Sequence, residues 1–226
     1  MKKRTIISLM MAMAMLVLLG SCEHDNLDAP DCRVYGHITY EGQRIGLKST
    51  NSTIQLELWQ NDFGLEKAQI IYVNQEGAFS TYAYKGGHLR IVAKPGSYPW
   101  KNTQDTVYID NIKGNHEFNY EVYPYYMIEN VEYSLADGVL TADFDIKEIY
   151  SEKSIAQAGI VVNRTQFVDL STAIKASGTK QNPGHVTLKM DVSKELESEK
   201  ALFCRVFTKI DGIDEALYSP DPYKLK

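Results

Sequence analysis

The sequence predicts an all-β protein made of two tandem β-sandwiches, and three observations support this prediction. Short runs of alternating apolar residues recur along the chain, as they do in half-buried strands. Turn residues such as Gly, Pro, Asn and Asp separate these runs. Tyrosine, which favours strands, accounts for 15 of the 226 residues. Short strands at regular spacing with turns between them are typical of β-sandwiches.

The first domain is expected at residues 32–124 and contains seven strands. In one of them Ile54, Leu56 and Leu58 recur at period two, which is the pattern of a strand with one buried face. The sequence Asn74-Gln75-Glu76-Gly77 predicts a tight turn between two others. The expected strands are 32–40, 53–60, 68–73, 78–84, 88–94, 106–110 and 117–123.

The second domain is expected at residues 125–226, after a boundary marked by Pro124-Tyr125-Tyr126. The sequence Leu135-Ala136-Asp137-Gly138 predicts a hairpin, because Asp-Gly favours the tight turns that join antiparallel strands. The expected strands are 127–134, 139–147, 158–163, 186–192, 202–209 and 215–218. Three further segments can each form a helical turn: 151–156, 168–174 and 194–197.

Residues 1–21 are expected to form a lipoprotein signal peptide. Three basic residues at positions 2–4 precede an apolar run at 6–19, which is too short to span a bilayer comfortably. The following Leu19-Gly20-Ser21-Cys22 resembles the lipobox of bacterial lipoproteins, in which the cysteine becomes the mature N-terminus and carries fatty acyl chains such as palmitate. The sequence therefore predicts anchoring in the outer membrane through Cys22, with a retained signal anchor as the alternative.

Residues 22–31 are expected to be an acidic tether. After Cys22 they contain four acids and no base, so they cannot bury a core of their own. The stretch is similar to the surface-export signal of Bacteroidetes lipoproteins, but a plain spacer would have the same composition. The cell surface is the expected location, with the periplasmic face of the outer membrane as the alternative.

Charge and cysteine content exclude some classes of function. The chain has 24 Lys and Arg against 29 Asp and Glu, a net charge of −5, and loss of the signal peptide changes this to −8. An acidic chain without a basic cluster is a poor nucleic-acid binder. Cys32 and Cys204 remain besides Cys22, and they either form a disulfide in an oxidising envelope or are ordinary strand residues.

The sequence contains no recognisable catalytic signature, metal-binding motif or phosphate-binding loop. Asp143 and Asp145 point the same way from one strand, which indicates a solvated face more than the facing carboxylates of a glycoside hydrolase. Asp211 and Asp214 flank a glycine in a turn, where acids bond local backbone, with a calcium loop as the alternative. We therefore expect no enzymatic activity, no metal and no cofactor.

Aromatic side chains are the candidates for ligand binding, because flat rings stack on the apolar faces of sugars. Trp59 lies on the opposite strand face from Leu56 and Leu58, and Tyr98 and Trp100 lie in a proline-bearing loop. Each of the three either contacts a ligand or packs under a neighbouring loop or domain. A further group at the domain boundary is expected to pack between the domains: Tyr123, Tyr125 and Tyr126.

Several motifs together resemble a family of two-domain Bacteroidetes lipoproteins of unknown function. They are Val34-Tyr35-Gly36-His37-Ile38, Leu58-Trp59-Gln60, Tyr72-Val73-Asn74-Gln75-Glu76-Gly77-Ala78-Phe79 and Tyr218-Ser219-Pro220, in addition to the lipobox and the tether. The resemblance implies a transthyretin-like or carboxypeptidase-regulatory-like first domain and a fibronectin type III-like second domain. Members of this family are commonly encoded beside SusC-like and SusD-like outer-membrane proteins of glycan uptake.

The leading functional hypothesis is a non-catalytic outer-membrane lipoprotein that assists the binding or uptake of a polysaccharide through Trp59, Tyr98 and Trp100. The second is a structural spacer that docks onto other outer-membrane proteins, with SusC-like and SusD-like proteins as the implied partners. The third is an enzyme of unrecognised type, which would need ionisable groups converging in a deep pocket.

Overall fold

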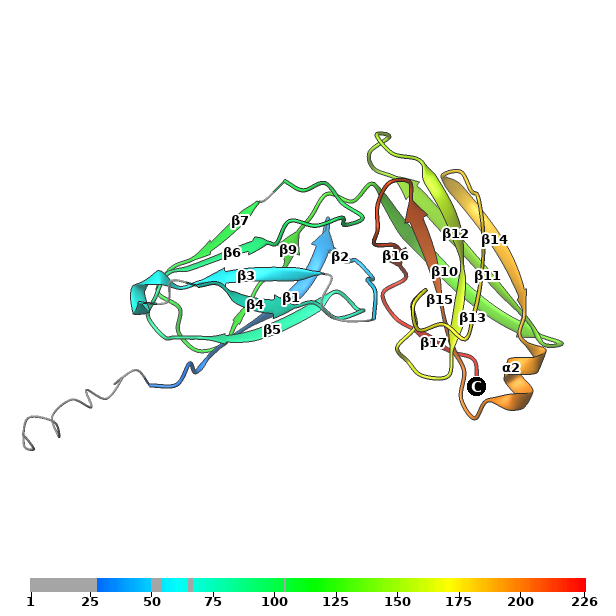
Figure 1. Cartoon of the computed structure of the whole chain (residues 1–226), viewed down its shortest axis with the longest axis horizontal. Helices are drawn as coiled ribbons and strands as arrows, with labels where there is room; N and C mark the ends of the chain where they lie inside the picture. Colours follow the sequence, from blue (N-terminus) through cyan, green and yellow to red (C-terminus); the bar gives the residue numbers. More distant parts are fainter. Residues whose placement is uncertain (1–27, 50–53, 65–66, 104) are drawn as a thin grey trace, which may run out of the picture. The chain divides into compact units, whose positions relative to one another are not determined.

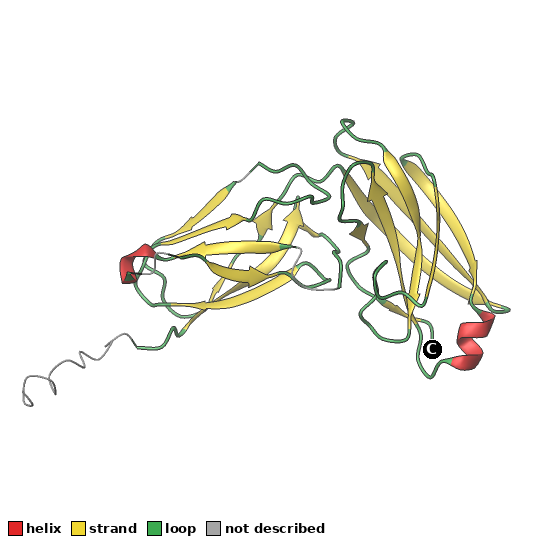
Figure 2. Ribbon diagram, viewed as in Figure 1, coloured by secondary structure: helices red, strands yellow, loops and turns green. Residues whose placement is uncertain are grey.

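The computed structural model describes residues 28–49, 54–64, 67–103 and 105–226. The predicted signal peptide, the predicted acylation site Cys22 and most of the predicted acidic tether lie outside the described residues. Asp31–Lys226 is one compact unit and holds all the described strands. Figures 1 and 2 show that strands dominate this unit. The protein is all-β, with several sheets that form two domains.

The first sheet of the first domain is built around the strand β1 (Cys32–Tyr40). This strand pairs antiparallel with two strands and parallel with two short strands from the end of the domain. The partners are β2 (Gln43–Arg44), β5 (Ala78–Ala83), β8 (His116–Glu117) and β9 (Tyr120–Glu121). The chain therefore returns to its first strand before it enters the second domain.

The second sheet of the first domain has the order β4-β3-β6-β7, and all its pairs are antiparallel. Its strands are β3 (Gln55–Trp59), β4 (Gln69–Tyr72), β6 (Leu89–Ala93) and β7 (Thr106–Ile109), and the 3-10 helix η1 (Asn61–Phe63) follows β3. Leu56, Leu58 and Ile91 face the core, where each is at most 2% exposed. Gln55, Glu57 and Trp59 lie on the outer face, as the alternation along the sequence predicts.

The second domain has a sheet of order β10-β11-β14 and a sheet of order β13-β12-β15-β16, with β17 also paired to β15. The strands are β10 (Tyr126–Ala136), β11 (Val139–Glu148), β12 (Ile155–Asn163), β13 (Lys175–Thr179), β14 (Gly184–Asp191), β15 (Phe203–Ile210), β16 (Leu217–Tyr218) and β17 (Tyr223–Lys224). Leu140, Ala142, Phe144 and Ile146 alternate with polar residues along β11 and are at most 1% exposed. The expected hairpin joins β10 and β11, with Asp137 and Gly138 both at positive φ.

The helical turns are where the structure differs most from the expected elements. Only the segment at 194–197 is helical, as α2 (Ser193–Ser198). The segment at 151–156 runs into β12, and that at 168–174 is a turn held by Asp169, whose carboxylate accepts the N–H groups of Ser171 and Thr172. The strand β13 that follows this turn was not expected from the sequence. Its exposed, weakly apolar residues give no period-two signal.

The buried side chain of Arg205 connects the two domains within the unit Asp31–Lys226. Its guanidinium is 0% exposed and donates to the carbonyls of Leu47 (2.8 Å) and Gln75 (3.1 Å) in the first domain. It also donates to the carbonyls of Val168 (3.2 Å) and Ser219 (2.6 Å) in the second domain. We refer to Arg205 and these four carbonyls as the junction cluster.

The boundary tyrosines divide into two buried residues and one exposed residue. Tyr125 and Tyr126 are 8% and 3% exposed, whereas Tyr123 is 37% exposed. The Tyr125 N–H donates to the carbonyl of Pro99 in the first domain (3.1 Å), and the Tyr126 hydroxyl donates to the carbonyl of Lys153 (2.5 Å). A hydrogen bond across the boundary is therefore observed for Tyr125, whereas the hydroxyl of Tyr126 is bonded within the second domain.

Cys32 and Cys204 are both buried and both free, so the disulfide alternative does not apply to this structure. Burial raises the pKa of both thiols, as expected of inert core cysteines. Among the described helices, none has the length and apolar character needed to cross a membrane.

Candidate functional site

The outer face of the β4-β3-β6-β7 sheet carries a row of three large side chains, one from each of three neighbouring strands. Trp59 on β3 is in register with Arg90 on β6, and Arg90 is in register with Tyr108 on β7. Residues opposite one another in an antiparallel pair project to the same face. The sheet therefore presents an aromatic ring, a guanidinium and a second aromatic ring side by side. We call these three residues the outer-face row.

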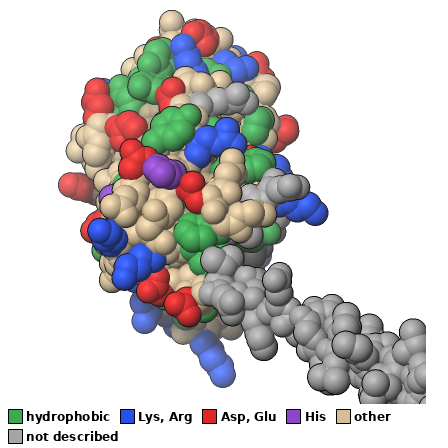
Figure 3. Space-filling model, turned by 90° about the vertical axis from the view of Figure 1, so that its left-hand side faces the viewer, with side chains coloured by type: hydrophobic (Ala, Val, Ile, Leu, Met, Phe, Trp, Pro, Cys, Tyr) green, Lys and Arg blue, Asp and Glu red, His purple; other side chains and the backbone are tan. Residues whose placement is uncertain are grey.

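A shallow pocket of about 240 Å³ lies at the outer-face row. Its lining combines the row with residues from η1 and from the loop before β6: Trp59, Asn61, Asp62, His88, Leu89, Arg90 and Tyr108. Figure 3 views the molecule from the side on which η1 lies in Figure 1, and hydrophobic side chains are scattered there among charged and histidine side chains. Rings flanked by a few polar groups are the usual composition of a small-molecule site.

The indole of Trp59 is held beneath Arg90. The guanidinium carbon lies 4.9 Å from the ring centroid, which is within the range of a cation–π contact. Trp59 is half-buried, and its Nε1–H is a buried donor without a hydrogen-bond partner among the described residues. The contact with Arg90 helps to stabilise this large ring on the outer face.

Tyr108 is the most exposed large ring at the site. Its side chain is 70% exposed, and no hydrogen bond or ring contact occupies it in the part of the chain that the structure describes. A ring in this state offers its face to a ligand at little cost, because nothing has to be displaced.

Asp62 and His88 form the polar wall of the pocket. The Asp62 carboxylate accepts the backbone N–H of His88 at 2.6 Å and lies 3.2 Å from Nδ1 of the same residue. The backbone hydrogen bond from His88 is the main reason why the pKa of Asp62 is below its usual value. Gly64, whose backbone is in the left-handed conformation with φ of 69°, ends the helix η1 that carries Asp62.

Tyr98 and Trp100 are not part of this surface. Each is only 3% exposed, and their ring centroids lie 5.0 Å apart. The loop that carries them is fixed against the domain boundary, where the carbonyl of Pro99 accepts a hydrogen bond from Tyr125 and Trp100 bridges to Pro124. Of the two alternatives predicted for Tyr98 and Trp100, ligand contact or packing, the structure shows packing. Their rings are covered by the protein and have no face open to a ligand. Of the three predicted contact residues, the structure brings only Trp59 to an open surface.

The acidic pairs singled out in the sequence lie on solvent-accessible parts of the surface. Asp143 and Asp145 share the exposed face of β11 and both lie near His185, with Nδ1 of His185 3.0 Å from Asp145. Asp211 and Asp214 are both exposed turn residues. Among the described residues no group of three or more His, Cys, Asp or Glu could hold a metal ion.

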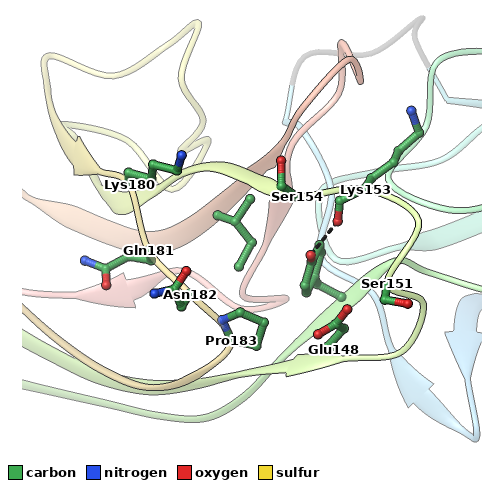
Figure 4. Close-up of a pocket in the computed structure, with 10 residues that line it drawn as sticks. Glu148, Ser151, Lys153, Ser154, Lys180, Gln181, Asn182 and Pro183 are labelled. Atoms are coloured by element: carbon green, nitrogen blue, oxygen red, sulfur yellow. Dashed lines mark hydrogen bonds between the residues drawn. The ribbon is translucent and has the colours of Figure 1, made fainter.

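A second pocket, in the second domain, has a volume of about 220 Å³. It lies between the loop that joins β11 to β12 and the loop that joins β13 to β14, and its lining is mostly polar. In Figure 4 the amino groups of Lys153 and Lys180 extend from opposite sides and do not meet at a common point. It offers a weaker case for ligand binding than the outer-face pocket, because it contains one aromatic ring, Tyr126, which is 3% exposed and tied to Lys153.

Sequence reasoning missed Asp62, His88, Arg90 and Tyr108. Their signal was present only in part: Arg90 and Tyr108 each alternate with buried neighbours, which puts them on the outer face of their strands. Which outer faces lie side by side depends on strand order and register, and a single sequence does not supply either.

Comparison with known proteins identifies relatives over nearly all the described residues. Residues 32–123 match a family described as "Protein of unknown function (DUF3823) N-terminal domain", and residues 126–221 match "Domain of unknown function (DUF3823_C)". No curated protein matches the chain.

Three solved structures show the similarity in three dimensions. A DUF3823 family protein from Parabacteroides merdae is 34% identical, with a TM-score of 0.79 over 88% of this chain and 100% of its own. A DUF3823 family protein from Bacteroides ovatus is 24% identical, with a TM-score of 0.77 over 87% of this chain and 100% of its own. A protein from Bacteroides uniformis described as a "putative carbohydrate binding protein" shares the fold at 14% identity, with a TM-score of 0.67 over 88% of this chain and 100% of its own.

Proposed function

The chain belongs to the DUF3823 family, and we propose that it is a non-catalytic outer-membrane lipoprotein that binds a polysaccharide. The observation that carries this proposal is the outer-face row, in which Trp59, Arg90 and Tyr108 border one pocket. The relative from Bacteroides uniformis supports it through its description as a "putative carbohydrate binding protein".

Binding would use the two kinds of group that the pocket combines. The exposed ring of Tyr108 stacks on the apolar face of a sugar, and the half-buried ring of Trp59 supports Arg90 beside it. Asn61, Asp62 and His88 supply hydrogen-bonding atoms that orient the hydroxyl groups. An open, shallow site of this kind accommodates one or a few sugar units of a longer chain.

The proposal gives the protein no catalytic role. The glycosidase arrangement needs two carboxyl groups that face each other across the scissile bond. The outer-face pocket has one carboxylate, Asp62, in its lining, and it is already bonded to His88. The proposed site therefore holds its ligand without changing it.

We further propose that the first domain is transthyretin-like or carboxypeptidase-regulatory-like and that the second is fibronectin type III-like. The second domain has a three-stranded sheet and a five-stranded sheet, and all their pairs are antiparallel, which supports the second assignment. For the first domain, we offer the parallel pairing of β8 and β9 with β1 as the feature on which a comparison with transthyretin-like folds tests the assignment.

Anchoring through acylated Cys22 and exposure at the cell surface complete the proposal. Mass spectrometry of the N-terminal peptide tests the acylation. Protease treatment of intact cells tests the location, because a surface protein is cleaved and one on the periplasmic face is protected. A free thiol at Cys22 would contradict the anchor.

The binding test uses a glycan array followed by affinity electrophoresis in gels that contain the polysaccharides found. Tyr108→Ala and Trp59→Ala should weaken binding about 2–10-fold, the range of one aromatic contact. Tyr82→Ala is the matched control, because Tyr82 is 52% exposed on β5, in the other sheet of the same domain. A blank array, or variants that bind as the wild type does, would contradict polysaccharide binding at this site.

A structural spacer is the second candidate, and the junction cluster favours it. A buried guanidinium that bonds carbonyls from both domains stiffens their connection, which suits a protein that docks onto other outer-membrane proteins such as SusC-like and SusD-like transporters. Co-purification with a transporter from solubilised membranes, together with a blank glycan array, would favour this role.

A further inference from the structure

We infer that the outer-face pocket selects sugars that carry a negative charge, a uronate carboxylate or a sulfate ester, and that Arg90 recognises this group. The inference rests on the proposed polysaccharide binding and adds the chemical class of the ligand. Four observations lead to it, and they concern Arg90, Asp62, the two rings and the surrounding charges.

Arg90 has its hydrogen-bonding capacity free. In the described part of the chain, the contact of its guanidinium with the Trp59 ring at 4.9 Å is its one side-chain interaction, and no carboxylate or carbonyl accepts its N–H groups. A guanidinium presents five donors in a planar fork, which suits two-point contact with a carboxylate. A sulfate ester offers a similar pair of charged oxygens.

The acid within the pocket forms no hydrogen bond or ion pair with Arg90 among the described residues. Asp62 is committed to His88, whose backbone N–H and ring nitrogen lie 2.6 Å and 3.2 Å from the same carboxylate oxygen. Glu57 shares the outer face of the sheet but lies opposite Val92 instead of Arg90. Two residues along a strand separate it from Trp59, a spacing of about 7 Å. The pocket therefore contains a positive charge without a hydrogen-bonded counter-charge.

One ring, that of Trp59, holds this charge in place. It lies against the guanidinium of Arg90, and Tyr108 is the register neighbour of Arg90 on β7. Stacking restricts the orientation of the fork, so less freedom is lost when a ligand binds. Apolar surface around the guanidinium also lowers the local dielectric, which strengthens a charge-assisted hydrogen bond.

The net charge of −8 expected after loss of the signal peptide opposes polyanions only at long range. Exposed charges are screened beyond about 10 Å at 0.1 M salt, whereas a hydrogen-bonded pair in a pocket is screened much less. Selectivity for an anionic sugar is thus set by Arg90 and should persist at physiological salt.

The test compares polymers that differ only in charge. Polygalacturonate is paired with its fully methyl-esterified form, and dextran sulfate is paired with dextran; the first pair reports on a carboxylate and the second on a sulfate. Affinity electrophoresis and titration of the tryptophan fluorescence measure binding by the wild type, Arg90→Gln, Arg90→Lys, Tyr108→Ala and Arg33→Gln. Arg33→Gln is the matched control, because Arg33 also lies over a ring, Tyr35 at 4.7 Å, but on the other sheet.

The wild type should prefer the charged member of at least one pair, and Arg90→Gln should lose about 10–100-fold in affinity for it, the range of charge-assisted hydrogen bonds. Arg90→Lys should restore only part of the lost affinity. Arg33→Gln should bind as the wild type does. Equal binding of charged and neutral polymers, or an Arg90→Gln variant with wild-type affinity, would overturn the selectivity while a loss in Tyr108→Ala would still support polysaccharide binding. No binding of any of the four polymers, together with a blank glycan array, would overturn both.

Discussion

Two arginines on strands, Arg205 and Arg90, each lie over an aromatic ring, but one is buried and the other is exposed. The guanidinium of Arg205 lies 4.8 Å from the ring centroid of Tyr218, and that of Arg90 lies 4.9 Å from the ring centroid of Trp59. Arg205 is 0% exposed and bonds four backbone carbonyls, whereas Arg90 is exposed and bonds no carbonyl among the described residues. An arginine over an aromatic ring is therefore no indicator of function by itself. The acceptors around it decide whether it supports the fold or remains available to a ligand.

The difference has an energetic basis at Arg205. Desolvation by burial lowers the pKa of its guanidinium to about 10, although nearby tyrosines and acids oppose this shift. The group is still charged at neutral pH. Its charge is tolerated because the carbonyls of Leu47, Gln75, Val168 and Ser219 replace the hydrogen bonds that water would make.

Arg205→Met should give the largest effect in stability. It removes a donor from four buried carbonyls, of which only that of Gln75 keeps another donor among the described residues, the N–H of Leu47. Each unsatisfied buried group costs roughly 1–3 kcal/mol, so we expect a loss of at least about 3 kcal/mol in the free energy of unfolding. Urea denaturation followed by fluorescence measures it. Arg205→Lys should remain strongly destabilised, since one ammonium cannot reach all four acceptors. A loss below about 1 kcal/mol would show that the junction cluster is not structural.

Gly46→Ala should give the second largest effect, because it introduces a clash at the same junction. An added Cβ at Gly46 would lie 2.3 Å from the carbonyl oxygen of Tyr218 and 2.6 Å from the nitrogen of Pro220, both backbone atoms that cannot turn aside. Overpacking of this kind costs about 1–3 kcal/mol. The same urea experiment measures this loss, and an unchanged midpoint would mean that Gly46 and Tyr218 can separate without cost.

Alkaline pH should weaken the junction through its tyrosines. Burial raises the folded-state pKa values of Tyr218 and Tyr133 above the unfolded value of about 10. The unfolded chain then loses protons first, so the stability is complete below about pH 10 and falls as the pH rises further. Arg205 contributes with the opposite sign, because its folded pKa is lowered, but the two tyrosines outweigh it. Urea midpoints between pH 8 and 11 measure the decline, which Tyr218→Phe should reduce. A midpoint that stays constant would contradict the linkage.

Arg90→Met should give the smallest effect on stability and so complete the contrast with Arg205. Its guanidinium bonds no carbonyl within the described ranges, and substitutions at exposed sites usually change the free energy of unfolding by less than about 0.5 kcal/mol. The same side chain should nevertheless dominate the binding of charged sugars. A destabilisation as large as that of Arg205→Met would show that Arg90 is a structural residue.

Much of the strand pattern could be predicted from the sequence, because alternation of apolar residues is a local signal. The residues Ile54, Leu56 and Leu58 fixed one face of β3, and this was enough to place Trp59 on the other face. The partners of Trp59 could not be predicted, since Arg90 and Tyr108 reach it only through the register of β6 and β7.

Tyr98 and Trp100 show the opposite limit of sequence reasoning. A proline-bearing loop with two large rings has the composition of a binding platform and also that of a packed loop. The backbone contacts that fix this loop come from Tyr125 and Pro124, more than twenty positions later. The same holds for Arg205, which sits in an apolar strand and whose acceptors Leu47 and Gln75 lie more than 100 positions earlier.

The parallel pairing of β1 with β8 and β9 has a consequence for the order in which the first domain assembles. Tyr35 on β1 and Glu117 on β8 are register partners, although 82 positions separate them along the chain. Closing so long a loop is slow compared with forming a hairpin such as β10–β11. The first strand of the domain thus keeps an unpaired edge, open to association with other chains, until β8 and β9 at the end of the domain reach it.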